Sequence, residues 1–369
     1  MLKLRKKLGK YQEIFYWVFI LLMTGMTSAG LNSEDRIYKI VFAVATLFLL
    51  LKLAVTDLTL REILVMAALT ALIGANFLRN GEKTLILTAM GIFGAKNVSL
   101  DKTVKYALWL KTVLTVGTLA LAAAGVIENA AMDLPKHGEI FRVYCYGYYH
   151  PNMAFANILV LLLLAILAYG DRLKWYAYVA GTAVMLVAYK FFFCRTGLVV
   201  WLVLCLTVLG FKLARHFKWE RAYMALLAAV PAVMAALTLI LPLWARKSSE
   251  VGGWLHLFLT GRIEHISRFL DGIGGLVLGA AVREPFDSMY FHLIYNYGWV
   301  LFGISILAYC AGVWYCSRKG NFYAAIALGV MAVYGFMEHL TLSVLWNLPL
   351  LYLSWLLFKE RRTTDEQLQ

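Results

Sequence analysis

The chain has 369 residues with a formal net charge of +14; 62% of them are hydrophobic, 15% are charged, and the mean hydropathy is +0.72. A water-soluble domain of this length cannot bury so much apolar surface, so the composition excludes one. The apolar runs are continuous rather than alternating and are about 17 to 25 residues long, which fits helices that cross a bilayer and excludes a β-barrel.

These runs predict an all-α fold, a polytopic transmembrane helical bundle that forms one integral membrane domain over 1–369. The first run follows a basic segment but is too long for a signal peptide, so we expect it to be a retained helix. About 12 spans are expected, at 12–29, 37–55, 61–78, 84–96, 105–127, 152–170, 174–193, 196–213, 222–244, 288–315, 321–337 and 341–358.

The placement of Lys and Arg predicts the orientation. With the amino terminus inside, most basic residues fall on the cytoplasmic side, which accounts for the positive charge without nucleic acid and makes both termini cytoplasmic. Two long connections then lie outside, at 128–150 and at 245–287, the larger one between spans 9 and 10. Within it, 254–270 is amphipathic and 271–275 is glycine-rich, which predicts a helix on the membrane surface followed by a turn. Function is expected in these external loops.

Two groups of external arginines are candidates for anion binding. Arg195 stands between two apolar runs, where it is either an interfacial arginine that reaches water or part of a site. In the larger loop Arg262 and His265 share a helical face, and such a face suits an anionic headgroup because the guanidinium fork pairs with phosphate oxygens. Glu264 and Arg268, at i and i+4, are expected to form an ordinary surface pair.

Two further features could serve a sugar substrate. Asp287 stands at the entrance of a long aromatic-rich helix, where it could act as a general base or cap the helix. The tyrosine-rich segment 142–152 offers flat faces that suit sugar rings, although tyrosine is also enriched in interfacial aromatic belts. His150 and Asn152 are less typical of a belt. There is no P-loop, dinucleotide fingerprint, zinc site or nucleophile elbow in the sequence.

Four short motifs, taken in order and with their sidedness, resemble the O-antigen polymerase and ligase superfamily. They are Arg-Thr-Gly at 195–197 between two spans, Thr-Gly-Arg at 260–262 in the large external loop, Asp-Ser-x-Tyr at 287–290 and Tyr-Gly at 297–298. His-Pro-Asn at 150–152, opening a span, is similar to the capsular and exopolysaccharide repeat-unit polymerases within this superfamily.

The resemblance implies a GT-C-like fold and a glycosyl transfer on the external face that needs no metal or other cofactor. In this family the substrate is carried on a polyprenyl diphosphate such as undecaprenyl diphosphate, an acceptor hydroxyl attacks the first sugar carbon, and the lipid diphosphate leaves. Fixed cations in a water-poor site stabilise the charge that the leaving group gathers. By position, Arg195 and Arg262 match the diphosphate-binding arginines, with Arg268 as a third candidate.

Asp287 occupies the place where the ligases usually have a histidine beside an asparagine. This departure weakens a ligase assignment and makes Asp287 the candidate base or acceptor-positioning group, with His265 and His292 as alternates. The candidate glycan-binding residues are Tyr146, Tyr149, His150, Asn152, Tyr290 and Glu338.

The expected function is polymerisation of polyprenyl-diphosphate-linked repeat units into capsule, exopolysaccharide or O-antigen at the bacterial cytoplasmic membrane. The expected partners are the lipid-linked donor and acceptor, membrane lipids, a flippase and a chain-length regulator. Two alternatives stay open: a ligase that transfers the glycan to another acceptor, and a secondary transporter or lipid-linked sugar flippase.

Overall fold

The computed structural model describes residues 8–136, 139–248, 250, 252, 253, 255, 259 and 261–358. Parts of the amphipathic stretch expected at 254–270, and Thr260 of its Thr-Gly-Arg motif, lie outside the described residues. The chain folds into two compact units. Unit 1 comprises Met1–Met66, Met90–Cys194 and Leu350–Gln369, and unit 2 comprises Ala67–Ala89 and Arg195–Pro349. Helices α4 (Leu60–Asn80) and α5 (Thr84–Gly94) each contribute to both units.

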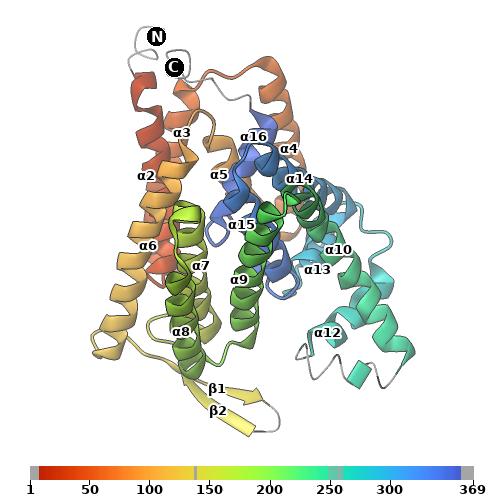
Figure 1. Cartoon of the computed structure of the whole chain (residues 1–369). Helices are drawn as coiled ribbons and strands as arrows, with labels where there is room; N and C mark the ends of the chain where they lie inside the picture. The colour runs from red at the N-terminus through yellow and green to blue at the C-terminus, as the bar shows by residue number, and fades with distance from the viewer. Residues whose placement is uncertain are drawn as a thin grey trace. The chain divides into compact units, whose positions relative to one another are not determined.

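Unit 1 is built from five long helices. They are α2 (Gln12–Ser28), α3 (Arg36–Val55), α6 (Leu100–Ala123), α7 (Pro151–Tyr169) and α8 (Trp175–Phe192). Helix α2 packs against α3 and α6, α6 packs against α7, and α7 packs against α8 (Figure 1). Short 3-10 turns, Gly9–Tyr11 and Gly170–Arg172, precede α2 and follow α7, and α16 (Ser354–Leu357) lies at the carboxyl end of the described chain.

A β-hairpin lies in the connection between α6 and α7. Strands β1 (Ala131–Lys136) and β2 (Glu139–Tyr144) pair antiparallel, with Ala131 opposite Tyr144, and β2 contacts α8 (Figure 1). The described chain is nearly all-α, as the sequence predicts, and this hairpin is the exception. Within the connection 128–150, strands 131–136 and 139–144 pair some of their backbone amide and carbonyl groups with each other.

At the centre of unit 2 is the buried helix α15 (Phe322–Gly335), which packs against three other long helices. These are α9 (Arg195–His216), α10 (Glu220–Lys247) and α14 (Gly298–Arg318). Shorter elements lie beside them: α12 (Arg262–Phe269), η3 (Leu270–Gly272), α13 (Met289–His292), the π-helix η4 (Leu293–Tyr297) and η5 (His339–Leu342). Single π turns inside helices are often associated with functional sites.

Seven described helices are long and apolar enough to cross a membrane, which makes this a multi-pass membrane protein. They are Arg36–Val55, Leu60–Asn80, Leu100–Ala123, Pro151–Arg172, Arg195–His216, Glu220–Lys247 and Met289–Arg318. Other apolar runs form shorter helices, among them Thr84–Gly94 and Phe322–Gly335. The last expected span, 341–358, is not one continuous helix. It is broken between η5 and η6 (Leu348–Leu353), because Pro349 has no amide hydrogen and Asn347 Nδ2 donates to the Thr341 carbonyl at 2.7 Å.

Candidate functional site

The centre of the candidate site is Arg262, which is bonded to two carboxylates. Its Nε lies 2.9 Å from Asp287 Oδ2 and its Nη2 lies 2.9 Å from Glu338 Oε1. Arg262 begins α12 directly after Gly261, whose φ of +75° favours glycine. Three segments far apart in the sequence therefore converge on one guanidinium, and each bond is of the strong, charge-assisted kind.

A pocket of about 170 Å³ opens beside this cluster. The His265 ring stacks on Phe286, with centroids 4.9 Å apart, and Phe286 also contacts Phe269 edge-on. The pocket therefore combines a charged side with an aromatic side, which is the partly exposed ring of His265 stacked on the buried Phe286. The lining residues are Gly261, Arg262, His265, Ile266, Phe286, Asp287 and Ser288.

The protonation of Glu338 is set by its surroundings. Burial raises the pKa of this carboxyl to about 7; the positive charge of Arg262 opposes the rise and the negative charge of Asp287 adds to it. A carboxyl with such a pKa exchanges its proton near neutral pH, as a general base or acid must. Glu338, expected only as a glycan contact, thus has the properties of an acid–base group.

The two carboxylates also change what Arg262 can do. The guanidinium carries one positive charge, while Asp287 and an ionised Glu338 together carry two negative charges. A diphosphate that binds Arg262 must therefore compete with these carboxylates. Protonation of Glu338 weakens that competition, so the charge available to an anion depends on the state of Glu338.

The other two arginines of the expected diphosphate site are in unit 2 but are not among the residues that line the pocket. Arg268 pairs with Glu264 at 2.7 Å with both side chains more than half exposed, which confirms the expected surface pair. Such a pair contributes little to stability. Arg195 is the first residue of α9 and is partly buried.

The four expected glycan contacts near the hairpin all belong to unit 1. His150 caps α7, because its Nδ1 accepts from the amide of Asn152 at 3.1 Å. Tyr146 packs edge-on against Phe192, and Tyr149 is 60% exposed. The structure therefore gives His150 and Asn152 a local role at the start of a helix.

Tyr290 and His292 lie inside unit 2. Tyr290 is fully buried, and its hydroxyl donates to the Ala332 carbonyl at 2.8 Å, so this ring packs in the core and presents no face to a glycan. His292 is 1% exposed, and its ring stacks on His339 with centroids 5.1 Å apart and an angle of 14° between the planes.

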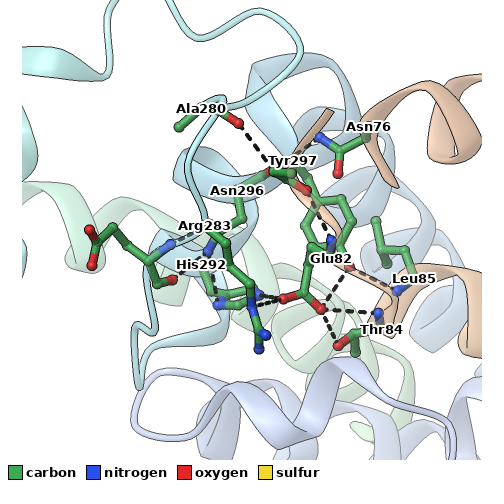
Figure 2. Close-up of polar contacts among 11 residues, drawn as sticks. Asn76, Glu82, Thr84, Leu85, Ala280, Arg283, His292, Asn296 and Tyr297 are labelled. Carbon is green, nitrogen blue, oxygen red and sulfur yellow. Dashed lines mark hydrogen bonds and ion pairs between the residues drawn. The ribbon is translucent and has the colours of Figure 1, made fainter. Parts of the chain in front are cut away.

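A buried polar cluster around Glu82 was not expected from the sequence. Glu82 Oε2 lies 2.5 Å from Arg283 Nε and 3.6 Å from His292 Nε2, and Oε1 accepts from the Thr84 hydroxyl at 2.6 Å (Figure 2). Burial opposes ionisation of the Glu82 carboxyl, but the contacts with His292, Thr84 and Arg283 together lower its pKa. In the sequence Glu82 sits in the charged connection Arg79–Lys83, which is indistinguishable from an ordinary solvated loop.

Three asparagines extend this cluster. Asn296 Nδ2 donates to the Glu284 carbonyl at 2.8 Å, and Oδ1 accepts from the Glu284 amide at 3.0 Å. Its backbone carbonyl accepts from the side chain of Asn76 (Figure 2) and also from that of Asn80. The end of α4 is thereby joined to the segment that leads to Asp287.

A second buried polar cluster lies in unit 1. Lys111, in the middle of α6, is fully buried, and its Nζ lies 2.8 Å from Ser28 Oγ and 3.2 Å from Asn157 Oδ1. Asn157 Nδ2 donates to the Thr27 carbonyl, which turns its oxygen toward Lys111. A lysine inside a spanning helix is a functional candidate. Among the described residues, no three His, Cys, Asp or Glu side chains are grouped in a way that could hold a metal ion.

Comparison with known proteins adds no relative: no family model, no curated protein and no solved structure matches this chain.

Proposed function

We propose that this chain polymerises polyprenyl-diphosphate-linked oligosaccharide repeat units into a surface polysaccharide. The observation that carries the proposal is Arg262, held by Asp287 and Glu338 at a pocket with an aromatic side. A cation beside acid–base carboxylates is what a metal-independent glycosyl transfer from a lipid diphosphate needs.

In the proposed reaction the oxygen of an acceptor-sugar hydroxyl bonds to the first carbon of the donor glycan. The bond between that carbon and the diphosphate oxygen breaks, and the lipid diphosphate leaves with the electron pair. The hydroxyl proton passes to Glu338, or to Asp287 beside it. Proton uptake makes Glu338 neutral, so the positive charge of Arg262 is less compensated just when the diphosphate gains negative charge.

The cellular setting is part of the proposal. We place the protein in the bacterial cytoplasmic membrane with twelve spans, a GT-C-like arrangement, both termini cytoplasmic and the pocket on the external face. A flippase would supply the lipid-linked units, and a chain-length regulator would act on the product. The charge bias of the sequence supports this orientation.

Surface glycan from a deletion strain, separated on a gel, tests the proposal. A polymerase predicts that only a single capped unit remains, and that expression of the wild-type chain restores the ladder. Arg262→Ala should fail to restore it, whereas the exposed Arg318→Ala, a matched loss of one arginine at the end of α14, should restore it. Long lipid-linked chains that never reach their acceptor would instead indicate a ligase.

A transporter or flippase is the second candidate, and Lys111 is the observation that favours it. Transporters often place polar groups inside the bundle, and Lys111, Ser28 and Asn157 form such a group in unit 1. The variant Lys111→Met separates the candidates. A flippase predicts that lipid-linked units accumulate in the cytoplasmic leaflet, while the polymerase predicts normal flipping in this variant.

A further inference from the structure

Three buried polar atoms in neighbouring residues of unit 2 have no hydrogen-bond partner within the described part of the chain. They are Ser288 Oγ, His292 Nε2 and His339 Nδ1. Ser288 lies one helical turn before His292, whose amide donates to the Ser288 carbonyl at 2.9 Å, and the His292 ring stacks on His339. Buried polar groups in native proteins are nearly always paired with protein, water or ligand, so these three atoms mark a place where a polar group can bind.

The hydrogen-bond network fixes which nitrogen of His292 carries the proton. The Glu284 amide donates to Asn296 Oδ1, which settles the orientation of the Asn296 side chain. Asn296 Nδ2 therefore faces His292 Nδ1, at 3.2 Å, and donates to it. With Nδ1 acting as the acceptor, Nε2 is the nitrogen that carries a hydrogen. His292 thus presents a donor to the space beside Glu82.

His292 Nε2 and Glu82 Oε2 lie close together without a direct hydrogen bond, so a hydroxyl beside the pair can contact both atoms. The donor nitrogen His292 Nε2 lies 3.6 Å from the acceptor Glu82 Oε2, a distance too long for a direct hydrogen bond (Figure 2). A bridging group must accept from the imidazole and donate to the carboxylate. A hydroxyl does both. A cation would be repelled by the N–H donor, and an anion would be repelled by the carboxylate.

The charges around the gap also favour a neutral occupant. The Glu82 carboxylate is compensated by Arg283 at 2.5 Å. Burial lowers the pKa of His339 to about 4, against the opposing effects of Asp287 and Glu82, so this imidazole is neutral at physiological pH. The hydroxyl of Ser288 is neutral as well.

Ser288 and His339 connect the unpartnered atoms to the Arg262 pocket. Ser288 lines that pocket, and His339 directly follows Glu338, the carboxylate that bonds Arg262. We propose that Ser288, His292, His339 and Glu82 form a subsite for a hydroxyl group, either of water or of the acceptor sugar in the pocket. The assignment to an acceptor sugar rests on the proposed function, while the subsite itself does not.

Two maps of the full chain in lipid nanodiscs test the subsite by electron cryomicroscopy, one without sugar and one with the neutral probe methyl β-glucopyranoside. We expect density within hydrogen-bonding distance of both His292 Nε2 and Glu82 Oε2. The same isolated density in both maps identifies water, and density continuous with the pocket in the second map identifies a sugar hydroxyl. An empty gap in both maps, at a resolution that shows other buried waters, would overturn the proposal.

A kinetic test uses Ser288→Ala with Thr46→Val as its matched control. Thr46 also has a buried hydroxyl without a partner among the described residues, but it lies in α3 of unit 1. Ser288→Ala should raise KM for the acceptor glycan roughly tenfold, which is the effect of losing about one hydrogen bond. The values of kcat and of KM for the donor should change little. Equal acceptor KM values in both variants would contradict a sugar hydroxyl in the subsite. The two proposals can fail separately. If the maps show an occupied subsite but Arg262→Ala restores a full ladder, the subsite stands and the proposed polymerase function is refuted.

Discussion

Arg262 and Glu338 are 76 residues apart in the sequence and joined by a hydrogen bond of 2.9 Å. The bond couples the charge of the guanidinium to the protonation of a buried carboxyl whose pKa is raised to about 7. The acid–base chemistry and the anion affinity of the pocket therefore depend on the same pair. Two predictions follow from this coupling.

Activity should rise with pH through about 7 in the wild type, because Glu338 accepts a proton only when it is ionised. Glu338→Gln should remove this rise and lower kcat by about 10² or more, the usual contribution of an acid–base group. The measurement is the pH profile of polymer formation by purified protein with lipid-linked units. A variant with the wild-type profile would show that Glu338 is not the base.

The same substitution should stabilise the fold above neutral pH. Since the folded-state pKa of Glu338 is raised, the folded protein binds more protons than the unfolded chain between about 4.5 and 7, and stability falls as the pH rises through that window. Glu338→Gln cannot ionise and should unfold at a higher temperature than the wild type at pH 8. At pH 4 the two should be similar. A variant less stable at pH 8 would contradict the account.

Arg262→Lys should separate charge from geometry. Lysine keeps the positive charge but lacks the planar fork that bonds Asp287 and Glu338 together. We expect the variant to fold, with a smaller loss of stability than Arg262→Ala, yet to lose most of its activity. Thermal unfolding and polymer length are the measurements, with Arg318→Lys as the matched control. Full activity in Arg262→Lys would mean that charge alone suffices.

His339 should make the fold sensitive to acid. Burial lowers its pKa to about 4, so below about 6.5 the unfolded chain binds more protons than the folded one. Stability should therefore decrease as the pH falls from 6.5 toward 4. His339→Phe keeps an aromatic ring against His292 and should flatten this decrease in thermal unfolding scans. An unchanged slope would show that His339 does not titrate as described.

Gly298 should tolerate no side chain. Its φ is +83°, and a Cβ there would lie 2.3 Å from the Gly279 amide nitrogen and 2.4 Å from the Val277 carbonyl oxygen. Gly298→Ala should destabilise the protein by roughly 2 kcal/mol or more. Gly303→Ala, in the same helix, is the control, because a Cβ at Gly303 would have no atom within 4 Å. Equal unfolding temperatures would contradict the close backbone contact.

The sequence predicts the spanning helices well, because long apolar runs between charged segments leave few alternatives. Run 37–55 is α3 and run 196–213 is α9, within a few residues. It does not predict the hairpin at 131–144, because such a short pairing has only a weak pattern. It also misses the break near Pro349, because the surrounding residues are as apolar as a continuous span.

The site is predictable only in part. Arg262 and Asp287 stand out as charges in an external loop and at a helix entrance, and the structure brings them together. Glu82 and Arg283 do not stand out, since each lies in a polar connection and only the fold buries the carboxylate of Glu82. Tyr290 is the opposite case, a residue that the sequence suggests for the site and the structure places in the core. An aromatic residue near polar ones has the same sequence pattern in both situations.

The most direct test of the central claim is the length distribution of surface glycan in a deletion strain that expresses Arg262→Ala, with protein levels matched to the wild type. We expect one capped repeat unit and no ladder, because the carboxylates lose their common partner and the leaving diphosphate loses its cation. A full-length ladder at wild-type abundance would contradict it.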